Sequence, residues 1–256
     1  MHIPKTTDGG ASAVVNIEIA GIRVSLDNKY RYIETIARPY LTEEPTVLTV
    51  SADEDEIKHE RGKLSVSAGY AESVVMYSKI AEQLYKFDAF VMHTAAVEVD
   101  SVTYLVTARS GVGKTTHVGL WLDAFGGRAR IINGDKPIIR KINGEFYAAG
   151  TPWCGKERLG CPDISKIKAI ALLERSAENS AVSLSAADAA EPLVGQLYMP
   201  KSPISIASSL GLLDELLKTK KIIKLKANMD ISAAHIAYRA MCENSEARTK
   251  RQQRFT

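Results

Sequence analysis

The sequence lacks several features that define specialised classes of protein. It has only three cysteines, Cys154, Cys161 and Cys242, which form neither a disulfide framework nor a paired metal-binding motif. No segment approaches the roughly 18 consecutive apolar residues of a membrane-spanning helix. The first ten residues lack the apolar run of a signal peptide. We therefore expect a cytoplasmic protein with no membrane partner.

Neither sign of charge predominates. The 33 Lys and Arg residues against 30 Asp and Glu residues give a formal net charge of +3, which is too balanced to favour nucleic acid as the main partner. Aromatic residues make up only 7%, but hydrophobic residues make up 45% of the 256 residues, enough for a substantial core. This is the composition of an ordinary globular protein.

The hydrophobic pattern predicts strands first, and then strands alternating with helices. Strands are expected at residues 13–19, 22–26, 46–50, 90–91, 95–99, 104–107, 131–132, 138–142, 145–148, 167–173 and 222–225. Helices are expected at residues 71–85, 115–125, 186–198, 204–217 and 231–242. The acidic run Asp53–Glu56 is interpreted as a solvated loop. Asn143-Gly144 is typical of a type I′ hairpin turn, and the nearly continuous apolar run 167–173 indicates a central strand.

This order predicts an α/β or α+β fold with a mixed β-sheet and flanking helices. No linker is long enough to separate two domains. We therefore expect a single domain at residues 1–245, with a β-rich N-terminal part at about 13–70 and a functional core at about 88–160. The remaining residues, 246–256, are expected to form a basic, flexible tail.

The strongest chemical motif lies between the expected strand 104–107 and the helix that follows it. Glycines at 111 and 113 permit unusual backbone angles, so that successive amides point at phosphate oxygens, and the helix N-terminus adds an anion site. Lys114 places a cation at the β- and γ-phosphates, and the Thr115 hydroxyl suits Mg²⁺. The strand–loop–helix context is that of a P-loop. The expected nucleotide-binding residues are Ala108, Arg109, Ser110, Gly111, Val112, Gly113, Lys114, Thr115 and Thr116.

Ala108 stands where the P-loop pattern has its first glycine. A methyl group at this position is tolerated if the residue has a negative φ, although it restricts the loop. The alternative interpretation of the segment is a Gly/Ser turn that begins an ordinary helix.

Four further residues are candidates for catalysis. Asp135 ends the apolar strand at 131–132, where it would hold Mg²⁺ or accept a proton from a substrate hydroxyl; the alternative is a turn aspartate. Lys156 and Arg158 lie in the loop Gly150–Gly160, which would close over a nucleotide and stabilise charge or is simply a charged surface loop. His93 is a candidate for direct chemistry or a structural histidine.

Three segments carry a family resemblance: 93–99 (HTAAVEV), 104–116 and 131–135 (IINGD). They resemble the catalytic, C-terminal domain of HPr kinase/phosphorylase, which shares a P-loop superfamily with ATP-dependent phosphoenolpyruvate carboxykinase. The resemblance covers about residues 88–160. His93 matches the family histidine that precedes two paired strands, and Lys114 and Thr115 match the P-loop lysine and hydroxyl.

The sequence also departs from the family at two positions. The family's Asp-Asp pair aligns with Gly134-Asp135, so only the second carboxylate is present. Thr116 stands where the family has an acidic residue.

The resemblance implies an α/β, HPr-kinase-like fold and an enzyme that uses ATP and Mg²⁺ to phosphorylate a hydroxyl. The acceptor would be a Ser or Thr of a peptide or protein, including a modified-peptide precursor, or a small metabolite. HPr kinases are oligomers, so a homo-oligomer is one expectation. Two alternatives remain. The departures at Ala108 and Gly134 favour a catalytically inactive nucleotide-binding regulator, and an ATP or GTP hydrolase switch is the other.

Overall fold

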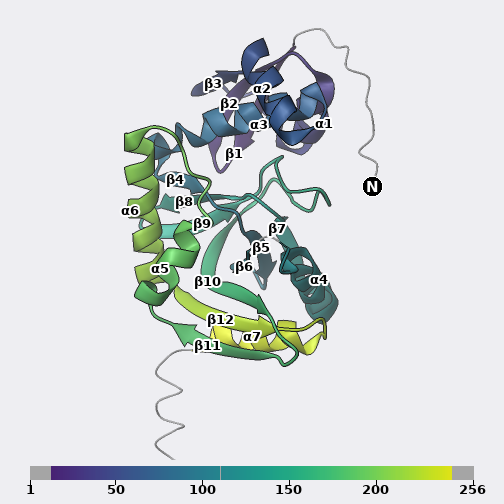
Figure 1. The fold of residues 1–256 in the computed structure, drawn as a ribbon. Helices are drawn as coiled ribbons and strands as arrows, with labels where there is room; N and C mark the ends of the chain where they lie inside the picture. Colours follow the sequence, from purple (N-terminus) through teal and green to yellow (C-terminus); the bar gives the residue numbers. More distant parts are fainter. Residues whose placement is uncertain (1–12, 110, 244–256) are drawn as a thin grey trace, which may run out of the picture.

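The computed structural model describes residues 13–109 and 111–243. They form a small three-stranded sheet and a large nine-stranded sheet, both covered by helices (Figure 1). The strands are β1 (Ala13–Ile19), β2 (Ile22–Asn28), β3 (Leu48–Ser51), β4 (Ala89–Val91), β5 (Ala95–Val99), β6 (Val102–Thr107), β7 (Ala129–Asn133), β8 (Ile138–Ile142), β9 (Glu145–Ala149), β10 (Ile164–Arg175), β11 (Ser180–Leu184) and β12 (Lys221–Ala227). The α-helices are α1 (Arg31–Ala37), α2 (Glu54–Leu64), α3 (Ala68–Ala81), α4 (Lys114–Phe125), α5 (Ala186–Val194), α6 (Pro203–Thr219) and α7 (Ser232–Cys242).

The small sheet, in the order β1-β2-β3, packs with helices α1 to α3 at one end of the molecule (Figure 1). Its buried residues share one hydrophobic cluster with β4, β8 and the start of the loop after β9. The acidic run at residues 53–56 is not a loop, so that expectation is wrong. Asp53 accepts a hydrogen bond from the Glu56 amide, and the Glu56 carboxylate accepts one from the Asp53 amide. This capping box begins α2.

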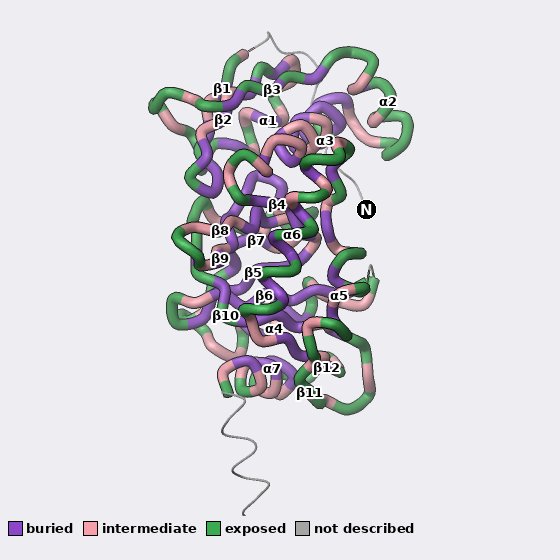
Figure 2. The backbone as a smooth tube through the Cα atoms, turned by 90° about the vertical axis from the view of Figure 1, so that its left-hand side faces the viewer, coloured by how far each residue is buried: buried purple, intermediate pink, exposed green. Residues whose placement is uncertain are grey.

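The large sheet places β10 at its centre, as the apolar run predicted. The first residues of β10 pair antiparallel with β9, and the later ones pair parallel with β6 and β12. Helices α4 and α7 cover one face, and α5 and α6 cover the other. Figure 2 shows that the central strands β5 and β6 consist mostly of buried residues. The predicted α/β fold with a mixed sheet is therefore confirmed.

Local turns follow the sequence closely. Asn143 and Gly144 have φ angles of 50° and 81°, as expected for the hairpin between β8 and β9. Asp100 and Ser101, between β5 and β6, also have positive φ angles, of 53° and 66°. Strand β11 and helix α1 were not expected from the sequence.

Two further expectations concern the C-terminal tail and membrane-spanning helices. The tail expected at residues 246–256 lies outside the described residues. Within the part of the chain that the structure describes, no helix is long and apolar enough to cross a bilayer.

Candidate functional site

The loop between β6 and α4 has the backbone conformation that its glycines predict. Gly111 has φ +80° and Gly113 has φ +108°, angles that strongly favour glycine. Helix α4 begins at Lys114, and no side chain caps its N-terminus among the described residues. The loop therefore leads into a helix end whose first amides have no side-chain acceptor, which is favourable for an anion.

Ala108 fits this loop without strain. It is not one of the residues with positive φ. Its side chain is buried and belongs to the hydrophobic cluster between the sheet and α4. The methyl group thus packs into the core, so the departure from glycine is compatible with the observed turn. Ser110 lies outside the described residues.

Lys114 is buried and incompletely paired. Its side chain is 12% exposed, and its Nζ lies 3.6 Å from Asp135 Oδ1. Among the described residues this Nζ has no hydrogen-bond partner. Burial lowers the pKa of Lys114, although the negative charge of Asp135 opposes that effect. A buried ammonium group without a hydrogen-bonding partner is costly, so an anionic ligand here would stabilise it.

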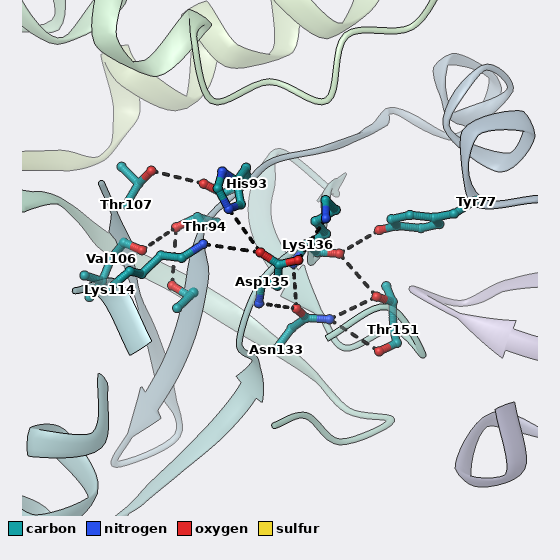
Figure 3. Close-up of polar contacts among 11 residues, drawn as sticks. Tyr77, His93, Thr94, Val106, Thr107, Lys114, Asn133, Asp135, Lys136 and Thr151 are labelled. Carbon is teal, nitrogen blue, oxygen red and sulfur yellow. Dashed lines mark hydrogen bonds and ion pairs between the residues drawn. The ribbon is translucent and has the colours of Figure 1, made fainter. Parts of the chain in front are cut away.

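Asp135 is the carboxylate around which three cationic or titratable side chains gather (Figure 3). His93 Nε2 lies 3.0 Å from its Oδ1, and Lys136 Nζ lies 2.8 Å from its Oδ2. Burial alone raises the pKa of Asp135, but the hydrogen bond with His93 and the charges of Lys136 and Lys114 outweigh it and hold that pKa well below its usual range. Asp135 is therefore ionised at neutral pH.

The turn that carries Asp135 is held by Asn133, a fully buried residue at the end of β7. Its Oδ1 accepts hydrogen bonds from the amides of Asp135 and Lys136, at 2.9 and 2.8 Å. Its Nδ2 donates to Thr151 Oγ1 at 2.9 Å, and the Thr94 amide donates to the Asp135 carbonyl at 3.0 Å. These bonds fix the carboxylate relative to β5 and β9 (Figure 3).

Helix α3 supports the same turn from the N-terminal part of the chain. The Tyr77 hydroxyl donates to the Lys136 carbonyl at 2.6 Å. The Tyr77 ring stacks on Trp153, with centroids 4.2 Å apart, and Trp153 Nε1 donates to the Ser73 carbonyl at 2.9 Å. The small sheet and its helices are thereby connected to the backbone beside Asp135.

The loop after β9 packs tightly against Gly134, the residue before Asp135. A Cβ on Gly134 would lie 3.2 Å from the carbonyl oxygens of Cys154 and Leu159, so the loop occupies the space that a side chain would need. A Cβ on Gly155 would lie 3.2 Å from Asp135 Cβ and 3.6 Å from Glu157 Oε2. Glu157 is exposed, and its negative charge opposes the effect of burial on the pKa of Lys114.

The structure brings together some of the expected catalytic residues and not others. His93, Lys114 and Asp135 meet, and Thr115 and Thr116 lie at the exposed start of α4. Lys156 and Arg158 are exposed, and the Arg158 guanidinium lies 5.9 Å from the centroid of the Tyr32 ring. Their expected role in charge stabilisation stays a prediction.

No role for Asn133 or Lys136 was predicted from the sequence. The Asn-Gly-Asp-Lys order was a usable signal for both, since an Asn side chain commonly accepts from the amide two residues on.

A groove of about 890 Å³ borders the β6–α4 loop. It lies at the carboxyl ends of the parallel strands β6 and β10 and extends to α5. Thr107, Arg109 and Val112 line it from the loop, and Arg175 lines it from β10. Ligands of parallel α/β sheets commonly bind at this edge.

Comparisons with known proteins give a distant structural similarity. No protein-family model matches the chain, and curated proteins show no significant match. Among solved structures, the chain is similar to the HPr(Ser) kinase/phosphatase from Coxiella burnetii, with 10% identity and a TM-score of 0.34 over 58% of this chain and 94% of that chain. This similarity is distant, and membership of the HPr kinase family stays a prediction.

Proposed function

We propose that this protein is an ATP-dependent phosphotransferase whose β6–α4 loop is a P-loop. The observation that carries the proposal is the buried Lys114 ammonium group, which has no hydrogen-bond partner in the described structure. Lys114 is the first residue of α4 and follows the Gly111-Val112-Gly113 turn, in which both glycines have positive φ angles. Phosphate oxygens would supply the missing acceptors, and the helix N-terminus would add to the attraction.

The local charge balance supports a polyanionic ligand. The ammonium groups of Lys114 and Lys136 and the imidazole of His93 all face the Asp135 carboxylate. Within this cluster two ammonium groups face one carboxylate, which leaves one excess positive charge. A γ-phosphate between Lys114 and the turn would neutralise this excess.

Mg²⁺ fits the oxygen donors of the same region. Thr115 and Asp135 would hold it. Within the described ranges no three His, Cys, Asp or Glu side chains form a metal site by themselves. This suits Mg²⁺, which proteins often bind through one or two carboxylates together with substrate phosphates. When bound, it would neutralise charge on the β- and γ-phosphates.

The proposed reaction is transfer to a hydroxyl of a peptide, protein or small molecule. The acceptor oxygen bonds to the γ-phosphorus while the bond to the β–γ bridging oxygen breaks, so that ADP leaves. The hydroxyl proton passes to Asp135, which is ionised and is oriented by His93 and by the turn that Asn133 holds. Lys114 holds the γ-phosphoryl group in place, and such positioning accounts for much of the catalysis in phosphoryl transfer.

The test is incubation with γ-labelled ATP and Mg²⁺, with and without a library of Ser- and Thr-containing peptides. We expect label on an acceptor with the wild type and none with Asp135→Asn, although that variant still binds ATP. Equal transfer by Asp135→Asn would contradict the role of Asp135. Free labelled phosphate without any acceptor would indicate an NTP hydrolase, and tight ATP binding with neither transfer nor release would indicate a regulator.

A further inference from the structure

Arg175 lies at the end of β10, directly beside the β6–α4 loop. Strands β6 and β10 are parallel, and their last paired residues are Thr107 and Leu172. The chain after β6 forms the loop, and three residues after Leu172 the chain reaches Arg175. Both segments therefore leave the sheet at the same edge, and Arg175 lines the groove of about 890 Å³ together with the loop.

The guanidinium of Arg175 lies over the glycine turn. Its Nη2 donates to the carbonyl oxygens of Gly111 and Val112 at 3.3 and 3.4 Å. The same Nη2 lies 4.0 Å from the point where a Cβ on Gly113 would be. Arg175 is therefore next to both residues whose positive φ angles shape the loop.

Within the described part of the chain, the charge of Arg175 has no carboxylate partner, because no Asp or Glu oxygen lies within 4.0 Å of it. The adjacent Glu174 pairs with Lys224 at 2.9 Å instead. Its two hydrogen bonds are long, both come from Nη2, and both go to neutral carbonyl groups. The other guanidinium N–H groups make no hydrogen bond to any described residue, so they remain available to an anion.

We propose that Arg175 is a further phosphate-binding residue, which contacts the phosphate chain of the nucleotide from the β10 side while Lys114 contacts it from α4. This inference rests on the proposed function. It is carried by the position of a guanidinium with no carboxylate partner among the described residues, over a loop whose amides and lysine already favour phosphate. Charge-assisted hydrogen bonds from arginine to phosphate are strong and directional.

Four variants test whether Arg175 binds phosphate through its charge or only supports the β6–α4 loop. Arg175→Ala removes the charge and the hydrogen bonds, Arg175→Gln keeps an amide donor without the charge, and Arg175→Lys keeps the charge and a donor. Lys226→Ala is the matched control, because it removes one exposed positive charge from the neighbouring strand β12. Thermal unfolding of each variant verifies that it is folded.

The measurement is calorimetric titration with ATP and Mg²⁺, and with inorganic tripolyphosphate as a probe without a base. We expect Arg175→Ala and Arg175→Gln to weaken both ligands by about tenfold to a hundredfold. Arg175→Lys should recover part of the affinity, and Lys226→Ala should bind like the wild type.

Two results overturn the inference, and they differ from failure of the proposed function. If Arg175→Gln binds as tightly as the wild type, Arg175 at most supports the loop through its hydrogen bonds. If Arg175→Ala also binds normally, Arg175 has no role in binding. If the wild type itself binds neither ATP nor tripolyphosphate, the proposed function fails and this inference fails with it.

Discussion

Lys114 Nζ and Asp135 Oδ1 lie 3.6 Å apart, close enough for an ion pair but without a hydrogen bond. The same Oδ1 is 3.0 Å from His93 Nε2, and the other carboxylate oxygen contacts Lys136. Asp135 is thus shared among three partners, and Lys114 is the least completely satisfied of them. This incomplete pairing of a buried cation is the basis of the proposed phosphate site.

Replacing Asp135 with asparagine should destabilise the fold at neutral pH by about 2 kcal/mol, because two lysines lose their common carboxylate. The pKa of Asp135 is lower in the folded protein than in the unfolded chain. Its stabilising contribution is therefore present above about pH 4 and is lost as the pH falls further. Urea unfolding at pH 7 and pH 3 gives the difference in the free energy of unfolding between the wild type and Asp135→Asn. An equal difference in stability at both pH values would contradict the account.

Two glycine-to-alanine variants test whether the turn before α4 requires a positive φ angle at Gly113. Gly113→Ala meets no close atom but must adopt φ +108°, so we expect a loss of about 1–2 kcal/mol. Gly119→Ala, inside α4, also meets no atom within 4 Å and has no positive φ. It should stabilise the protein by up to about 1 kcal/mol, because alanine favours helix.

Thermal or urea unfolding gives the change in the free energy of unfolding for each of these two variants. A Gly113→Ala protein as stable as Gly119→Ala would show that the turn is not constrained as described. Loss of ATP affinity only in Gly113→Ala would further agree with the proposed role of the loop.

Tyr77→Phe should slow phosphoryl transfer more than it weakens ATP binding. The change removes the hydroxyl that donates to the Lys136 carbonyl and keeps the ring that stacks on Trp153. Thr151 still donates to the same carbonyl at 3.2 Å, so we expect a loss of only about 1 kcal/mol in stability. Steady-state kinetics should show a lower kcat at a nearly unchanged KM for ATP. A change confined to KM would indicate that the Tyr77 hydroxyl does not position the turn that carries Asp135.

The burial of His117 leads us to expect a second pH dependence of the free energy of unfolding, separate from that of Asp135. Its Nε2 accepts a hydrogen bond from Trp121 Nε1, and burial lowers the pKa of His117 from 6.5 to about 4. Between these values the unfolded chain binds more protons, so stability should fall by about 3 kcal/mol as the pH falls from 6.5 to 4. His117→Gln should flatten this part of the profile, measured by urea unfolding. An unchanged profile would show that another group is responsible.

The sequence was most informative where local patterns determine structure. The strand–loop–helix at 104–125 and the Asn143-Gly144 hairpin were predicted because apolar periodicity and positive-φ residues are local signals. The acidic run Asp53–Glu56 was misinterpreted, because its charges were assigned to solvent although Asp53 and Glu56 form a capping box. Strand β11 was missed because exposed and half-buried residues alternate irregularly along this edge strand.

The candidate site was only partly accessible from the sequence. Lys114 and Asp135 were found through motif spacing, but Tyr77 reaches the site through a contact between segments far apart in the chain. Arg175 reaches the loop only because β10 lies parallel beside β6. Such pairings depend on the tertiary arrangement of strands, which no local pattern in the sequence specified.

The most direct test of the central claim is calorimetric titration of ATP and Mg²⁺ into the wild type and into Lys114→Ala, with Lys226→Ala as a charge-matched control. It needs no knowledge of the acceptor. The account predicts measurable ATP binding by the wild type and by Lys226→Ala, and an affinity at least about a hundredfold lower in Lys114→Ala. ATP binding of equal strength in Lys114→Ala, or none in the wild type, would contradict it.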